Sequence, residues 1–119
     1  MLKDLDAGKF KAVYIVCGYT DLRYGIDGLA NKVQNEFELN PFDRDILFLF
    51  CGRRADRIKG LLWEGDGFLL LYKRIEKGRF CWQGNKEELR SISKNQYELL
   101  MKGLTIDPLI HKVSYERYE

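Results

Sequence analysis

Short apolar runs separated by polar turns predict two strands and a helix in the first half of the chain. Residues 12–17 (AVYIVC) are β-branched and aromatic, as in a buried strand. Residues 46–51 (ILFLFC) are apolar at every position, which predicts a strand that is central in a sheet or covered on both sides. Between the two runs, apolar residues recur at helical spacing from Ile26 to Phe37, so one face of a helix is expected to pack on the sheet.

The residues before this helix allow two positions for its beginning. Thr20 or Asp21 is suited to cap it, because short polar side chains accept hydrogen bonds from the first free N–H groups. Gly25 and Gly28 weaken a helix, however. They indicate either a close backbone approach or a turn at 21–25 that precedes a helix beginning nearer Gly25.

A meander of three strands is predicted from Ile46 to Phe80, because two further apolar runs, residues 57–64 and 68–75, follow the first. The segment Gly65-Asp66-Gly67 between them is the strongest hairpin signal in the chain. Its two-residue turn is either Asp66-Gly67 or lies one residue earlier. Residues 79–82 are a candidate for a fourth short pairing.

The two faces of this hairpin differ in character. Odd-numbered residues of its first strand share a face with even-numbered residues of its second. One face carries the better core residues, which are Ile58, Leu62, Leu69, Leu71 and Ile75. The other has cations at one end and apolar or aromatic residues toward the turn: Arg57, Lys59, Leu61, Trp63, Phe68, Leu70, Tyr72 and Arg74.

Two interpretations of this amphipathic face remain open. If it is exposed, its aromatic rings can stack on bases while the flanking cations hold phosphates. Alternatively, it forms a second small core under the C-terminal tail or the segment around Trp82. General burial tendencies favour the core interpretation for Leu61, Trp63 and Phe68.

The pattern becomes helical after Gly84. Ser93 and Gln96 have the spacing of a capping box, and Ile92 with Tyr97 fits a hydrophobic staple. The apolar side of the predicted helix, which Gly103 ends, consists of Tyr97, Leu100, Met101 and Leu104.

These elements predict one α+β domain over residues 1–119. We expect a mostly antiparallel sheet of about four strands, in β-α-β-β-β-α order, with helices packed on it. Residues 1–11 are expected to form a loose arm or a short helical turn, and residues 108–119 a tail that is either a short helix or extended.

The distribution of charge along the chain indicates a nucleic acid as a candidate partner. The formal net charge of +2 is too small to indicate a nucleic-acid partner by itself. Residues 53–79, however, hold eight cations and four anions, a local charge of +4. We therefore expect phosphate contacts, chiefly without base specificity, from Arg53, Arg54, Arg57, Lys59, Lys73, Arg74 and Arg79, with Trp63 and Tyr72 as secondary contacts if they are exposed.

Catalytic, metal and cofactor chemistry is not expected. The carboxylates have the settings of caps and turns, and the predicted hairpin order lacks the βαβ crossover of a parallel sheet. No nucleophile can be placed against His111, the single histidine. Three widely spaced cysteines suit neither a disulfide framework nor a zinc site and indicate a reducing cytoplasm. Neither a signal peptide nor a membrane span is expected.

Three motifs carry a family resemblance: GYTDLRYGIDGLA at residues 18–30, NPF at 40–42 and LFLFCGRRADRIKGLLWEGDGFLLLYKRIEKGRF at 47–80. They resemble the transposon protein B family (TnpB), the second-open-reading-frame products of the IS-sixty-six insertion sequences. The resemblance implies an accessory protein of transposition, beside a separate and larger transposase, with no established catalytic residues.

Two functions follow as expectations. In the first, the chain binds DNA, the transposase, or both. In the second, it is a protein–protein adaptor whose tail and Leu61/Trp63/Phe68/Leu70 face dock on the transposase or on a second copy.

Overall fold

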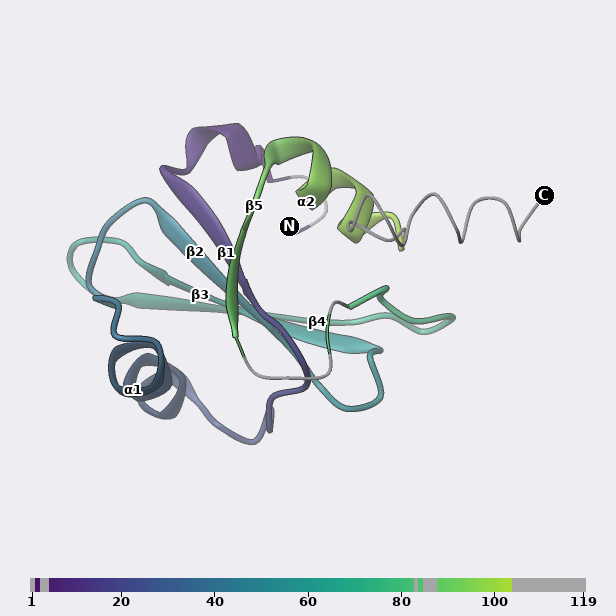
Figure 1. Ribbon diagram of the computed structural model, residues 1–119, viewed down its shortest axis with the longest axis horizontal. Coiled ribbons are helices and arrows are strands. Elements are labelled where there is room, and N and C mark those ends of the chain that lie inside the picture. The colour runs from purple at the N-terminus through teal and green to yellow at the C-terminus, as the bar shows by residue number, and fades with distance from the viewer. Residues whose placement is uncertain (1, 3–4, 83, 85–87, 104–119) are drawn as a thin grey trace.

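A five-stranded mixed sheet forms the centre of the computed structural model, which describes residues 2, 5–82, 84 and 88–103. The strands have the order β4-β3-β2-β1-β5, in which β1 and β2 are parallel and all other neighbours are antiparallel (Figure 1). Their bounds are Ala12–Val16 (β1), Ile46–Cys51 (β2), Arg57–Trp63 (β3), Phe68–Arg74 (β4) and Leu89–Ile92 (β5). The helices are the 3-10 turn η1 (Ala7–Lys9), α1 (Ile26–Glu36) and α2 (Lys94–Met101).

Helices cover both faces of the sheet. Helix α1 lies on one face, and η1 with α2 lies on the other (Figure 1). Every residue of β2 is buried, as its apolar pattern predicts, because Phe48 packs on the α1 side and Leu49 on the α2 side. The sheet is therefore the middle layer of three.

The predicted α+β class is confirmed, but the predicted sheet is wrong in two respects. A mostly antiparallel sheet of four strands was expected, whereas β1, α1 and β2 form a βαβ crossover that makes one strand pair parallel. The expectation that the chain lacks such a crossover is therefore wrong as well. The second error is β5, which pairs with β1 at the sheet edge. Its sequence LRSI is half exposed and too short to show a period.

The candidate fourth pairing at residues 79–82 does not form. Instead, the Phe80 N–H donates a single hydrogen bond to the Ala55 carbonyl at 2.6 Å, and its ring is buried in the core. The Trp82 indole donates to the Val16 carbonyl at 2.8 Å. Side-chain burial and isolated hydrogen bonds thus hold this segment against the sheet. It does not form the regular backbone hydrogen bonds of a paired strand.

The beginning of α1 decides between the two alternatives left by the sequence. Gly25 is the N-cap residue and supplies no side-chain cap. The Asp21 carboxylate instead accepts a hydrogen bond from the Arg23 N–H at 3.0 Å, and the Tyr24 N–H donates to the Asp21 carbonyl. The interpretation of a turn at 21–25 before the helix is correct.

The capping box of α2 is confirmed. Ser93 Oγ accepts from the Gln96 N–H at 3.1 Å, and Gln96 Oε1 accepts from the Ser93 N–H at 2.8 Å. Tyr97, Leu100 and Met101 are buried against the sheet. Leu104 and the 108–119 tail lie outside the described residues.

The β3–β4 hairpin turns at Gly65-Asp66, the earlier of the two predicted positions. Glu64 N–H donates to the Gly67 carbonyl at 2.9 Å, and Gly65 has φ of +99°. Because the register pairs Trp63 with Phe68, the predicted division of the hairpin into two faces holds. The amphipathic face does form a second core at Leu61, which α1 covers, whereas Trp82 packs against the other core cluster; the tail lies outside the described residues.

Candidate functional site

Two loops meet at the carboxyl ends of the parallel strands. Residues 18–25 follow β1 and residues 52–56 follow β2, so parallel pairing brings both to one edge of the sheet. The Thr20 N–H donates to the Cys51 carbonyl at 2.8 Å. A Cβ atom on Gly52 would lie only 3.2 Å from the Leu22 side chain, so a glycine here allows the loops to touch.

The second loop presents two arginines to solvent. The Ala55 N–H donates to the Gly52 carbonyl at 2.9 Å, which places Arg53 and Arg54 at the two corners of a four-residue turn. Both side chains are exposed, and neither has a carboxylate partner within the described part of the chain. Their charges are therefore available to a ligand.

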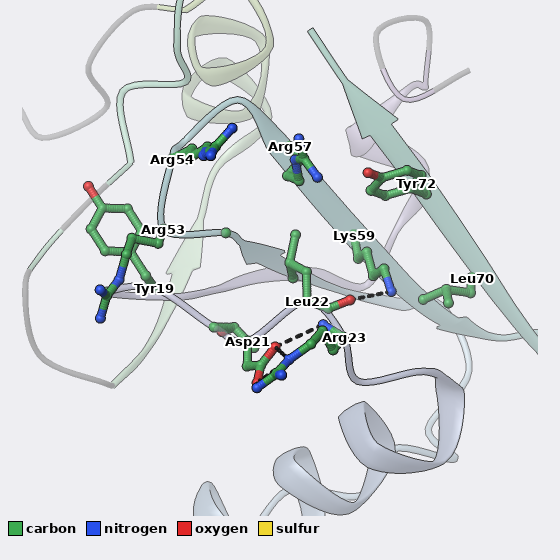
Figure 2. A pocket seen from close by; sticks show the side chains of 13 residues that line it. Tyr19, Asp21, Leu22, Arg23, Arg53, Arg54, Arg57, Lys59, Leu70 and Tyr72 are labelled. Carbon is green, nitrogen blue, oxygen red and sulfur yellow. Dashed lines mark hydrogen bonds and ion pairs between the residues drawn. The ribbon is translucent and has the colours of Figure 1, made fainter.

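Lys59 ties the first loop to the hairpin. Its Nζ donates to the Leu22 carbonyl at 2.7 Å, as Figure 2 shows, and to the Tyr24 carbonyl at 3.0 Å. The same Nζ lies 5.7 Å from the centre of the Tyr72 ring, its cross-strand neighbour. Lys59 thus uses its hydrogen bonds to hold the first loop against the hairpin, which forms the wall of the site. While these bonds are formed, the same N–H donors are not offered to an anion.

These elements enclose an open groove with a volume of about 1300 Å³, which we name the basic groove. Figure 2 shows its side chains rising from the two loops and from β3 and β4. Its lining residues are Gly18, Tyr19, Thr20, Asp21, Leu22, Arg23, Gly52, Arg53, Arg54, Arg57, Lys59, Leu70 and Tyr72.

The basic groove is strongly positive for a chain of net charge +2. Five lining residues are cationic (Arg23, Arg53, Arg54, Arg57 and Lys59) and one is anionic (Asp21), so the lining carries 5 − 1 = +4. Hydrogen bonds from Arg23, the shortest at 2.7 Å, hold the pKa of the Asp21 carboxyl at about 2. Asp21 therefore stays ionised at neutral pH and offsets one arginine.

In its availability to a ligand, Arg57 is intermediate between the cations that have no carboxylate partner and those that hydrogen bonds hold in place. Its Nε donates to the neighbouring Asp56 carboxylate at 3.2 Å, and its side chain is about one third exposed. Asp56 itself is not part of the groove lining. The guanidinium keeps further N–H donors for a ligand, because one of its five is used.

Five of the nine residues predicted to bind DNA line the basic groove: Arg53, Arg54, Arg57, Lys59 and Tyr72. The other four lie elsewhere. Lys73 is on the opposite face of the hairpin, across from Ile58, and Arg79 is exposed in the loop after β4. Arg74 is paired with Glu76 at 3.1 Å.

Trp63 lies at the far end of the hairpin, about 20 Å along the strand from Arg57 at 3.3 Å per residue. There its ring is 5.0 Å from that of Phe42 and 4.9 Å from that of Phe68. We name these three rings the aromatic cluster. Trp63 therefore lies outside the basic groove.

Sequence reasoning missed Tyr19 and Arg23. Both lie in the loop before α1, more than 25 residues away in the chain from the arginine turn. The signal was present as the mostly polar segment from Tyr19 to Arg23, which follows a buried strand after a short gap. Its meaning depended on the parallel pairing of β1 with β2, which was not predicted.

The cysteines lie outside the basic groove. Cys17 and Cys51 are buried free thiols, and burial raises the pKa of Cys51 to about 12. Among the described residues, no three histidine, cysteine or acidic side chains are grouped as a metal site requires. His111 lies outside the described residues. Within the described part of the chain, no helix has the length and apolarity needed to cross a membrane.

The model of the family described as "IS66 Orf2 like protein" matches residues 11–110, a span that includes the whole groove lining. The chain belongs to the IS66 Orf2-like family. This confirms the resemblance to the IS-sixty-six accessory proteins and supports an accessory role associated with transposition.

Two relatives of this IS66 Orf2-like protein come from Sinorhizobium fredii (strain NBRC 101917 / NGR234). The uncharacterized protein y4hO is 37% identical over 100 residues, which cover 84% of this chain and 86% of the relative. The uncharacterized protein y4jC is 33% identical over 84 residues, 71% of each chain. Neither name states a ligand or a partner. No solved structure matches the chain at a significant level.

Proposed function

We propose that this IS66 Orf2-like protein is a non-catalytic accessory factor of transposition that binds DNA phosphates in the basic groove. The observation that carries the proposal is the groove charge of +4 on a chain whose net charge is only +2. The positive charge is thus concentrated on one concave surface. Such a surface attracts a polyanion, because each phosphate that it neutralises releases condensed counterions.

The groove cations differ in availability, which ranks their expected contributions. Lys59 is engaged with two backbone carbonyls, and Arg23 is paired with Asp21. Arg53 and Arg54 are exposed at the corners of their turn and have no carboxylate partner in the described part of the chain. They are expected to supply the largest share of the phosphate contacts.

The test is a salt titration of binding to a duplex oligonucleotide, measured by fluorescence anisotropy with the full chain. The variant R53A/R54A removes two groove charges. Its matched control, K77A/R79A, removes two exposed charges that lie outside the groove. Each variant loses two positive charges, so the two variants have the same net charge as each other. Their comparison therefore separates a local contact from general electrostatic attraction.

R53A/R54A is expected to weaken binding and to reduce the slope of log K against log salt by about 1.8, since each phosphate contact contributes about 0.9. K77A/R79A should leave the slope within experimental error of the unmodified chain. Absence of binding at about 50 mM salt, or equal losses for both variants, contradicts the proposal.

The adaptor function is the second candidate, and the aromatic cluster is the observation that favours it. Phe42 is 49% exposed although its ring contacts both Trp63 and Phe68. Leu61 no longer contributes to a docking face, since it is fully buried beneath α1. Capture of the element's transposase, repeated with Phe42→Ser, tests this candidate. Undiminished capture by the variant counts against the cluster as the contact.

A further inference from the structure

The basic groove contains more than phosphate binding requires. Four large apolar or aromatic side chains are strongly exposed among the described residues, and two of them, Tyr19 and Tyr72, line the groove. Tyr19 is 48% and Tyr72 is 54% exposed. Leu22 and Leu70 add apolar surface between them. Phosphates gain nothing from such surface, whereas planar bases do.

Tyr72 is held in position to receive a planar ligand. It projects from β4 opposite Lys59, whose Nζ lies 5.7 Å from the ring centre and is itself fixed by two carbonyls. This contact occupies part of the ring, and about half of the residue stays open to the groove and solvent. The ring is therefore a fixed platform with cations beside it.

A duplex cannot use this platform. Its bases are stacked and paired inside the helix, so it offers a protein its phosphates and its base edges. A single strand offers both the phosphates and the faces of its bases. The groove volume of about 1300 Å³ also exceeds the range of roughly 300–1000 Å³ typical of pockets for one small ligand, so it has room for several linked units.

We propose that the basic groove binds single-stranded DNA, with phosphates on Arg53, Arg54 and Arg57 and bases stacked on Tyr72 and Tyr19. This inference rests on the proposed function, that the groove binds DNA phosphates. It adds the form of DNA: a strand that has been separated from its complement, as an excised or melted element end would supply. The contacts are independent of base identity, because every base has a face that can stack.

The test compares binding of a labelled oligo-dT strand and a duplex of equal length to the full chain at one salt concentration. Tyr72→Leu removes the ring and keeps a bulky apolar side chain on the strand. Tyr24→Leu is the matched control, because Tyr24 is 48% exposed in the adjoining loop but does not line the groove. Tyr19→Leu repeats the test on a loop, in case the β4 variant does not fold.

Tyr72→Leu and Tyr19→Leu are each expected to lower affinity for the single strand about 5- to 150-fold, the range for one lost base stack. Duplex affinity should fall by clearly less than single-strand affinity for both, because the stacked bases of a duplex cannot use the rings, and Tyr24→Leu should change neither affinity. Single-strand binding that folded Tyr72→Leu and Tyr19→Leu proteins retain at full strength overturns the inference.

The two proposals fail in different ways. If neither DNA form binds at low salt, the proposed function fails and the inference fails with it. If both forms bind, and R53A/R54A weakens them equally while the tyrosine variants have no effect, phosphate binding stands and the single-strand inference fails. Equal loss of both forms in a folded tyrosine variant also contradicts stacking.

Discussion

Replacing Lys59 with methionine tests whether this cation builds the wall of the basic groove. Methionine preserves most of the aliphatic stem and removes the hydrogen bonds to the carbonyls of Leu22 and Tyr24, at 2.7 and 3.0 Å. A hydrogen bond from a charged group contributes about 1.5–3 kcal/mol when it is well shielded. Lys59 is only partly buried and water can reach both carbonyls, so the pair together should contribute about 2 kcal/mol.

At roughly 4 °C per kcal/mol for a chain of this size, Lys59→Met should lower the Tm by about 8 °C in a thermal melt followed by circular dichroism. The matched control is Lys73→Met on the other strand of the hairpin. Lys73 faces the opposite side and has no ion-pair or hydrogen-bond partner in the described residues, so its change should stay within about 0.5 kcal/mol. Equal Tm values for the two variants would refute the assignment of Lys59 as the structural clamp.

Three further predictions concern stability. Thr20→Val should raise the free energy of unfolding by about 1 kcal/mol in a urea titration, because the buried Thr20 hydroxyl has no hydrogen-bond partner in the described structure; a loss of stability contradicts this. Ser93→Ala should cost about 1 kcal/mol by removing the α2 cap, whereas Ser91→Ala, at an exposed position of β5, should cost less than about half of that. Stability should also fall as the pH rises above 9. Burial raises the pKa of Cys51 from 9.0 and that of Tyr97 from 10.0, both to about 12, so the unfolded chain loses these protons first. A flat profile between pH 9 and 11 in thermal melts contradicts this sign. Cys51→Ala should reduce the earlier part of the decline without abolishing it, because burial also raises the pKa of Cys17 and of Cys81.

Much of the fold was readable because the relevant signals are local. The alternation of residues 57–63 and 68–74 predicted both faces of the hairpin, and Ser93 with Gln96 predicted the beginning of α2. Such patterns depend on neighbours within one turn or one hairpin. The uninterrupted apolar run of β2 likewise predicted a strand buried on both faces. In a strand with one solvent-exposed face, every second side chain would be polar.

The candidate site was only half readable. Arg53, Arg54, Arg57, Lys59 and Tyr72 were found because they cluster in sequence. Lys73, Arg74 and Arg79 were found for the same reason, but Lys73 faces the other side of the hairpin, Arg79 lies in the loop after β4, and Arg74, beside Arg57, pairs with Glu76 outside the groove lining. A local excess of charge does not reveal which side chains converge. The position of Tyr19 and Arg23 in the groove could not be predicted for the opposite reason, since their neighbours in space are far away in the chain.

By itself, then, the sequence determined β1 to β4, the two α-helices, the alternation of faces in the hairpin and the family to which the chain belongs. The tertiary structure alone decided the direction of β1 against β2 and the place of β5, because both depend on contacts between distant segments. One such contact, the hydrogen bond from the Thr20 N–H to the Cys51 carbonyl, joins the two loops behind the parallel strands. Parallel pairing places both loops at one edge of the sheet. There, cations and tyrosines that are far apart in the sequence line one groove.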